Sequence, residues 1–151
     1  MSASGSGVPP PPDALLLRPG DLTPDDLRRL AEAPISLSLT RSSWEAVDAA
    51  RLVVDSAAAG ERPVYGVNTG FGKLATTRIA RPQIEELQRR LIVSHMCGCG
   101  APLSDPVVRL TLALKAASLA RGFSGVRRET IGHLLRLHEA GALPVIPSQG
   151  S

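Results

Sequence analysis

VVRLTLALKAASLA, residues 107–120, determines how the rest of the chain must fold. Ala and Leu dominate this segment, and both residues favour helix. Ser104 precedes it as a candidate N-cap, and Pro106 lies in the expected first turn. Apolar residues occur on nearly every face of such a helix. We therefore expect a core helix that other elements cover from several sides.

The neighbouring segments predict a mainly α-helical fold with short strands at most. Thr23 and Pro24 are typical of a helix start, and Ser42-Ser43-Trp44-Glu45 fits a capping box. The apolar run Leu15–Leu17 and the alternation over residues 35–39 predict two short strands. The five predicted helices span about 24–33, 42–60, 82–96, 104–120 and 127–140.

The chain has 151 residues, of which 43% are hydrophobic, and it carries 17 basic against 14 acidic side chains. This length suits one domain, and the apolar content excludes a disordered chain. No apolar run reaches the roughly 18–20 residues of a membrane span. Residues 1–12 are mostly Ser, Gly and Pro, which predicts a disordered leader without the apolar segment of a signal peptide. Together with two closely spaced cysteines, Cys97 and Cys99, this predicts a cytoplasmic protein.

Neither nucleic acid nor metal is an expected partner. The four aromatic residues are scattered, whereas binding of nucleic acid by stacking requires aromatics interleaved with basic side chains. His95, Cys97 and Cys99 form His-x-Cys-x-Cys, but zinc sites use wider cysteine spacing and a fourth ligand. His133 and His138 are expected at the surface or its boundary. His95, at a helix end beside glycines, is either structural or part of a pocket wall.

Residues 61–81 have no regular period and contain YGVNTGFGKLA at 65–75. The segment lacks the strand and the helix that a dinucleotide fingerprint needs, and Val67 and Leu74 break the phosphate-loop pattern. The glycines form either a structural cluster of turns or a mobile lid that presents Tyr65 to a ligand. As a general base, Tyr65 would need neighbours that favour its anionic form.

Four ordered blocks of this sequence resemble the N-terminal part of the aromatic amino-acid ammonia-lyases, and those of the histidine type most of all. The resemblance runs in order over residues 15–151, and PGDLT at 19–23 fits it as well. The blocks are VYGVNTGFGKL at 64–74, LQ at 87–88 through LIVSH at 91–95 with Gly98 and Gly100, SLARGFSG at 118–125, and PVIP at 144–147 with Gly150-Ser151.

The resemblance implies an enzyme of histidine catabolism that converts L-histidine to urocanate and ammonia and assembles as a homotetramer. Such enzymes use a methylidene-imidazolone electrophile, formed autocatalytically from Ala-Ser-Gly, and no metal. Tyr65 corresponds to the lid tyrosine that is regarded as the catalytic base. The resemblance places Thr69, Gly70 and Phe71 in the lid, and Asn68 and Gly72 both in the lid and at the substrate.

Ser94-His95 matches the pair that differs between substrate classes of the family. A histidine at the second position resembles the histidine-selective form, because an imidazole can exchange a hydrogen bond with the substrate ring. Three departures from the family pattern stand out. Met96, Cys97 and Cys99 replace small residues, and Ala117 stands where Asn is common. The sequence also ends at Gly150-Ser151, where family members continue into Ala-Ser-Gly.

We therefore expect residues 13–151 to be the N-terminal helical region of an ammonia-lyase, truncated before the cofactor motif and inactive alone. An enzyme like tyrosine 2,3-aminomutase, or another aromatic ammonia-lyase, is the nearest alternative. A non-catalytic remnant that associates with a full-length subunit is the second alternative. The apolar helix at 107–120 also predicts an exposed apolar patch, because so short a chain has little with which to cover it.

Overall fold

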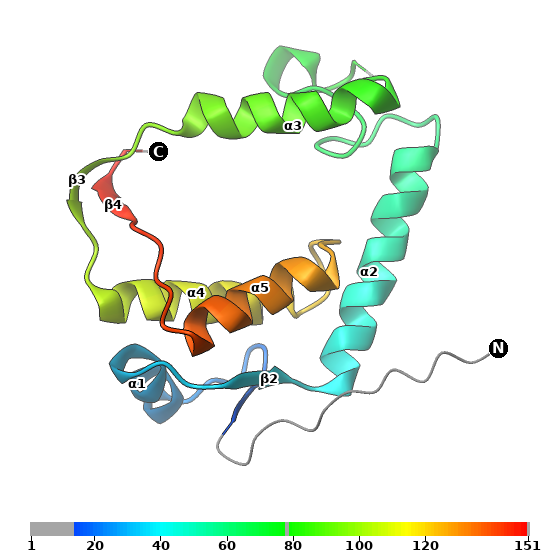
Figure 1. Cartoon of the computed structure of the whole chain (residues 1–151). Helices are drawn as coiled ribbons and strands as arrows, with labels where there is room; N and C mark the ends of the chain where they lie inside the picture. Colours follow the sequence, from blue (N-terminus) through cyan, green and yellow to red (C-terminus); the bar gives the residue numbers. More distant parts are fainter. Residues whose placement is uncertain (1–13, 78, 151) are drawn as a thin grey trace.

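The computed structural model describes residues 14–77 and 79–150, and within them the fold is mainly α-helical, as predicted (Figure 1). The predicted leader, residues 1–12, lies outside the described residues. Each predicted helix is present. The helices are α1 (Pro24–Glu32), α2 (Arg41–Ala59), α3 (Arg81–His95), α4 (Asp105–Leu119) and α5 (Arg128–Glu139), and the strands are β1 (Leu15–Leu17), β2 (Leu37–Leu39), β3 (Cys99–Pro102) and β4 (Pro147–Gln149).

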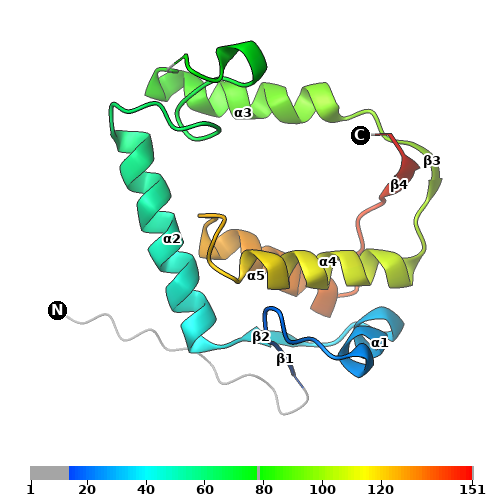
Figure 2. The same cartoon turned by 180° about the vertical axis from the view of Figure 1, so that it is seen from behind.

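Helix α4 lies at the centre of the core, as its sequence predicted. It contacts α1 and α5, and Figure 1 and Figure 2 show α5 beside it from both directions. Ala113 and Ala116 of α4 are fully buried with Leu30 of α1 and Ile131 of α5. The small alanine side chains let the helices approach closely, so two neighbours are enough to cover most of an apolar helix.

Helix α1 is capped at both ends by side chains. Thr23 Oγ1 accepts the backbone N–H of Asp26 at 3.2 Å, and Asp26 Oδ2 accepts the backbone N–H of Thr23 at 3.0 Å. These hydrogen bonds hold the pKa of Asp26 below its ordinary value. At the other end, Arg109 Nη1 donates to the Ala31 carbonyl at 2.9 Å. The last carbonyls of a helix lack partners within it, so Arg109 ties the end of α1 to α4.

His138 is fully buried, and the prediction that it lies at the surface or its boundary is wrong. Its ring nitrogens lie 3.2 Å from the backbone oxygens of Leu30 and Ile35. These oxygens lie at the end of α1 and before β2, more than a hundred residues earlier in the chain, and sequence spacing cannot reveal such partners. His133 is exposed, as predicted.

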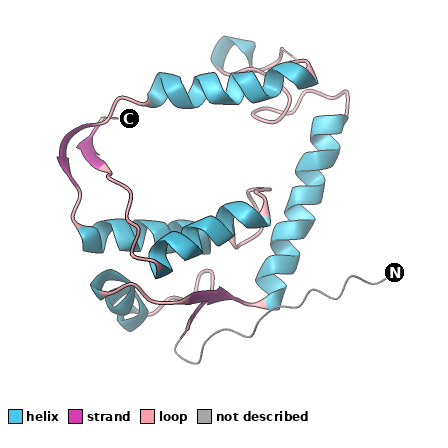
Figure 3. Ribbon diagram, in the orientation of Figure 1, coloured by secondary structure: helices cyan, strands magenta, loops and turns pink. Residues whose placement is uncertain are grey.

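Strands β1 and β2 form a short parallel pair, and β2 contacts α5 (Figure 3). Leu15 lies opposite Leu37, and Leu17 lies opposite Leu39. Both strands were predicted from their apolar pattern. Their parallel pairing follows from the intervening helix α1, because parallel strands need a crossover connection.

Helix α2 leaves the core and leads to the candidate site (Figure 1). Its N-cap is Thr40, whose Oγ1 accepts the backbone N–H of Ser43 at 3.0 Å. The capping box predicted to begin at Ser42 is therefore wrong. The helix begins earlier, because Thr40 accepts the backbone N–H of Ser43, which has no partner within the first turn. Gly60 ends the helix as predicted.

The first half of α2 is held against α5. Arg128 Nε donates to Asp48 Oδ1 at 2.6 Å, and the guanidinium carbon lies 5.2 Å from the centre of the Trp44 ring. Gly125, with φ +62°, lies so close to Val54 that a Cβ at this position would collide with Val54 Cγ2. A glycine is required here for both its backbone conformation and its size.

Exposed apolar side chains are present, and those of α2 and α3 are more exposed than those of α4, while the predicted contiguous patch stays a prediction. Leu52 and Val53 of α2 are 70% and 69% exposed, and Ile92 and Val93 of α3 are 64% and 56% exposed. The two helices farthest from the core thus carry part of the exposed apolar surface, while Val107 and Leu114 of α4 are each 44% exposed. None of the described helices is both long enough and apolar enough to cross a membrane.

The segment after α3 pairs with the end of the described chain. Strands β3 and β4 are antiparallel, and the sequence did not predict them. A Cβ on Gly98 would lie 2.5 Å from Pro147 Cγ, and one on Gly150 would lie 2.5 Å from the Cys97 carbonyl oxygen. Two blocks that are far apart in sequence therefore lie side by side, and their glycines permit the close approach.

Candidate functional site

The loop between α2 and α3 is an ordered cluster of turns. The backbone N–H of Ile79 donates to the Asn68 carbonyl at 2.9 Å, and that of Gly70 donates to the Thr77 carbonyl at 3.1 Å. These two bonds close the loop at its base, and the 3₁₀ turn η1 (Gly72–Leu74) lies between them in sequence. The predicted turn cluster is thus present, and movement of this segment as a lid stays a prediction.

Asn68 anchors this loop to the end of α2. Its side chain is 2% exposed, and its Oδ1 accepts the backbone N–H of Val64 at 2.7 Å. Its Nδ2 donates to the carbonyls of Ala57 and Arg62, each at 3.0 Å. Both amide protons and one oxygen lone pair are therefore used inside the chain. Asn68 shapes the loop in this structure, and its predicted contact with a substrate stays untested.

Tyr65 lies at the outer face of the loop and is 64% exposed. Its ring meets the ring of Phe71 edge to face, with 5.9 Å between the centroids and 79° between the planes. Gly66, with φ +74°, turns the chain between the two aromatic residues. Packing thus orients the Tyr65 ring, while its hydroxyl makes no hydrogen bond to the described residues.

Thr69, Gly70 and Gly72 lie beside these residues. Thr69 is 2% exposed, and its Oγ1 donates to the carbonyl of Gly70 at 3.0 Å. Gly72 has φ +57°, and a Cβ added to it would meet nothing within 4 Å. Its glycine is therefore required by backbone conformation and not by close packing within the chain. The predicted substrate contact of Gly72 stays a prediction.

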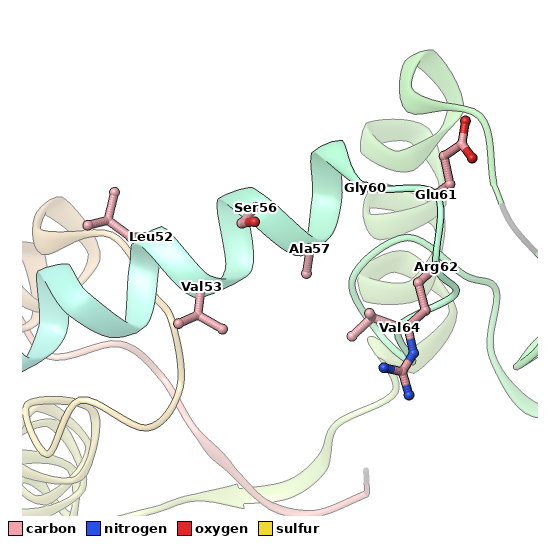
Figure 4. A pocket seen from close by; sticks show the side chains of 8 residues that line it. All are labelled: Leu52, Val53, Ser56, Ala57, Gly60, Glu61, Arg62 and Val64. Atoms are coloured by element: carbon pink, nitrogen blue, oxygen red, sulfur yellow. The ribbon is translucent and has the colours of Figure 1, made fainter.

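A hollow of about 550 Å³ lies between the second half of α2 and the base of the loop (Figure 4). Leu52, Val53, Ala57 and Val64 give it an apolar lining, and the polar side chains of Glu61 and Arg62 lie beside it. Tyr65, Ser94 and His95 do not line this hollow. It is therefore distinct from the predicted substrate site.

Ser94 and His95 form the last residues of α3, and both are exposed. His95 Nδ1 lies 2.8 Å from the Leu91 carbonyl oxygen and 3.1 Å from Ser94 Oγ. Ser94 Oγ also donates to the Leu91 carbonyl at 2.8 Å. Cys97 and Cys99 follow and are exposed. Within residues 14–77 and 79–150, no three His, Cys, Asp or Glu side chains cluster as a metal ion would require.

The structure does not bring the predicted base and the predicted selectivity pair together. The loop that carries Tyr65 lies beside the first half of α3, whereas Ser94 and His95 lie at its far end (Figure 1). With 15 residues, the helix is about 22 Å long. The described residues thus place the two parts of the predicted site apart, and a pocket that contains both would need further elements.

Comparison with known proteins identifies the family. The model of the aromatic amino acid lyase family matches residues 22–151. The chain belongs to this family. A histidine ammonia-lyase of Rhodospirillum rubrum is 52% identical over 139 residues, which is 92% of this chain. The chain spans 27% of the length of that relative.

Solved structures of lyase-family relatives show the same fold. The histidine ammonia-lyase of Trypanosoma cruzi superposes with a TM-score of 0.80 at 37% identity, over 91% of this chain and 26% of that one. A tyrosine aminomutase of Streptomyces globisporus superposes with a TM-score of 0.83 at 28% identity, over the same shares. The fold is thus shared between lyases and aminomutases, and the higher sequence identity lies on the lyase side.

The aromatic amino acid lyase family implies a methylidene-imidazolone group formed from Ala-Ser-Gly. Residues 14–77 and 79–150 contain no Ala-Ser-Gly, so the described residues cannot form this group. The chemistry open to the site residues named above is proton transfer at the Tyr65 hydroxyl and hydrogen bonding at Ser94 and His95.

Two features of the site were missed by sequence reasoning. The Leu91 carbonyl contacts both members of the predicted selectivity pair, and its distance of three and four residues from Ser94 and His95 is a recognisable back-bonding pattern in a helix. The β3–β4 pair fixes the chain directly after His95. Its signal was the close spacing of Gly98 and Gly100, with Gly150 at the other end.

Proposed function

We propose that this chain forms the lid and part of the pocket wall of a histidine ammonia-lyase, which converts L-histidine to urocanate and ammonia. The observation that carries the proposal is the 52% identity to a histidine ammonia-lyase over 92% of the chain, with Ser94-His95 at the end of α3. Because the chain spans 27% of that relative, the complete site includes parts that these residues do not supply.

In this proposal Tyr65 is the base that removes a proton from the carbon next to the amine-bearing carbon. Its exposed ring, oriented by Phe71, leaves the hydroxyl available to a substrate. The loop is held in shape by Asn68, Thr69, Gly70 and Gly72. In the proposed site the backbone at Gly72 would approach the substrate, and the open space around this glycine supports that role. Closure of this loop would bring Tyr65 to the reacting carbon and exclude water.

The side chain of the substrate would bind at the end of α3. His95 and Ser94 are exposed there, and the imidazole of His95 can exchange a hydrogen bond with the imidazole of L-histidine. A methylidene-imidazolone group, supplied by residues outside those described, would provide the electrophile that activates the substrate for loss of ammonia. We further propose a homotetrameric, cytoplasmic enzyme of histidine catabolism.

An aminomutase acting on tyrosine is the second candidate, because a tyrosine aminomutase shares the fold with a TM-score of 0.83. A non-catalytic chain that associates with a complete subunit is a third, and the exposed apolar side chains of α2 and α3 support it. Co-purification with a larger subunit, without any lyase activity of the assembly, would favour this third candidate.

A chimera tests the proposal. Residues 14–150 replace the matching part of the Rhodospirillum rubrum histidine ammonia-lyase, and the chimera is incubated with L-histidine and, separately, with L-tyrosine. We expect urocanate from histidine and no β-tyrosine from tyrosine. The parent enzyme is the control. A folded chimera that assembles as the parent does and yet fails to form urocanate would contradict the proposal, and β-tyrosine would favour the aminomutase.

A further inference from the structure

In the last turn of α3, the Nδ1 atom of His95, the Oγ atom of Ser94 and the carbonyl oxygen of Leu91 lie within hydrogen-bonding distance of one another. His95 Nδ1 lies 2.8 Å from the Leu91 carbonyl oxygen and 3.1 Å from Ser94 Oγ, and Ser94 Oγ lies 2.8 Å from the same carbonyl oxygen. A carbonyl oxygen accepts hydrogen bonds and cannot donate them. A separation of 2.8 Å between Nδ1 and this oxygen therefore requires a proton on Nδ1.

The remaining contacts agree with this assignment. If Nδ1 carries the proton, the Ser94 hydroxyl cannot donate to it, so the hydroxyl proton goes to the Leu91 carbonyl and an oxygen lone pair faces Nδ1–H. One arrangement of protons thus satisfies all three distances. With the proton on Nε2 instead, two acceptors would face each other at 2.8 Å without a hydrogen between them, which is unfavourable.

We propose that the end of α3 fixes the neutral His95 ring in the Nδ1–H tautomer, and that Ser94 is the positioning residue for this state. The inference rests on the proposed function for its substrate. The consequence lies at the other ring nitrogen. Nε2 then has a bare lone pair, and it makes no hydrogen bond within residues 14–77 and 79–150. The neutral ring is an acceptor toward the ligand.

An acceptor at this position selects ligands by their donors. A substrate side chain with a ring N–H or a hydroxyl can donate to Nε2, whereas a phenyl ring leaves this nitrogen without a partner once water is excluded. The hydroxyl of Ser94 contributes through His95 and need not touch the substrate. The chemistry that fits the end of α3 is therefore an aromatic amino acid with a donor group on its ring.

Two-bond ¹⁵N–¹H correlation directly measures which nitrogen of the His95 ring carries the proton. The experiment uses the full 151-residue chain with ¹⁵N-labelled histidine. His95→Gln assigns the signals among three histidines. At a pH where the ring is neutral, we expect a protonated Nδ1 and a bare Nε2 for His95. Ser94→Ala should lower the ratio of the Nδ1–H to the Nε2–H tautomer by about three- to tenfold, the cost of one hydrogen bond. Ser94→Thr keeps the hydroxyl and should preserve the ratio.

An Nε2–H tautomer in the unaltered chain would overturn the proposal, and an unchanged ratio in Ser94→Ala would remove Ser94 from its role. Because this readout needs no catalysis, it is independent of the proposed lyase activity.

If the chain alone gives the signals of an unfolded protein, the chimera provides the test. Ser94→Ala is expected to raise KM for histidine about three- to tenfold with little change in kcat, and Ser94→Thr to restore it. An unchanged KM in the Ser94→Ala chimera overturns the positioning role.

Discussion

Asn68 Nδ2 donates to the carbonyl oxygen of Ala57 at 3.0 Å and so caps the end of α2 from eleven residues farther along the chain. Carbonyls in the last turn of a helix have no partner within it. The same side chain binds the backbone at Arg62 and Val64. One buried amide thus joins the last turn of α2 to the start of the loop that carries Tyr65.

Removal of this amide should unfold the loop more readily than the core. Asn68→Ala leaves a backbone N–H and two carbonyls without their partner, and we expect a loss of about 1–3 kcal/mol in the free energy of unfolding. Urea denaturation followed by circular dichroism measures it. Thr76→Ala, an exposed change in the same loop, is the control and should be nearly neutral. Equal stability of the two variants would show that the Asn68 contacts contribute little.

The Asp48–Arg128 pair should make the free energy of unfolding depend on pH in the acidic range. The pKa of Asp48 lies below its ordinary value of 3.8, mainly because the Arg128 side chain donates hydrogen bonds to its carboxylate. A carboxylate with a lowered pKa stabilises the folded state above its unfolded pKa, and this contribution is lost as the pH falls through the folded value. Asp48→Asn should therefore be less stable than the unaltered chain at neutral pH, and the difference should vanish well below pH 3.8.

The measurement is urea unfolding followed by the fluorescence of Trp44, the single tryptophan of the chain, which lies beside Arg128. The side chains of Asp48 and Arg128 are each about half exposed, so the effect is expected to be small and to weaken with salt. Asp21→Asn is the matched control at an exposed carboxylate. A difference between Asp48→Asn and the unaltered chain that persists unchanged into strong acid would refute the assignment.

Gly125 tests the contact between α2 and the segment before α5. Gly125→Ala combines a positive φ of +62° with a collision against Val54 Cγ2, whereas Gly20→Ala combines a φ of +89° with open space. We expect Gly20→Ala to cost about 1–2 kcal/mol from strain alone. Gly125→Ala should cost about 1–3 kcal/mol more from overpacking. Adding Val54→Ala should recover part of the second loss, and equal costs at both glycines would argue against the close contact.

Tyr65 should matter for turnover and not for folding. In the chimera, Tyr65→Phe removes the hydroxyl but keeps the ring against Phe71, so we expect kcat to fall by about 10²–10⁴-fold with unchanged stability. Phe71→Leu is the control for ring packing, and its kcat should fall far less. Near-normal kcat in Tyr65→Phe would exclude Tyr65 as the base.

His95 should determine selectivity. His95→Phe in the chimera removes the acceptor at the end of α3, and the ratio of kcat/KM for histidine to that for phenylalanine should fall by about tenfold or more. The exposed His133, changed to Phe, is the control because it lies on α5, whereas His95 is the last residue of α3. If the ratio is the same in the His95→Phe chimera and the unaltered chimera, His95 does not select the substrate.

Local signals in the sequence predicted the helices well. Contacts between residues far apart in the sequence were not predicted. Thr23 and Pro24 marked the start of α1, because an N-cap and a proline in the first turn are local signals. Burial of His138 depends on carbonyls more than a hundred residues away, and no local pattern contains that information. The Ser94-His95 pair was found through the family resemblance, while the role of the Leu91 carbonyl required the geometry of the helix end.

Helix α3 carries the proposed selectivity pair, yet none of its described side chains is fully buried. Its attachment to the molecule therefore lies at its ends, at the turn cluster and at the pair of β3 with β4, whose residues are all exposed. Segments with few buried contacts open locally at a lower free energy than the core. Amide hydrogens of α3 should thus exchange long before those of α4 and α5, as a separate cooperative unit. The residues that would recognise the substrate thus belong to a part of the described chain that opens more easily than the core, and a bound ligand would slow exchange there.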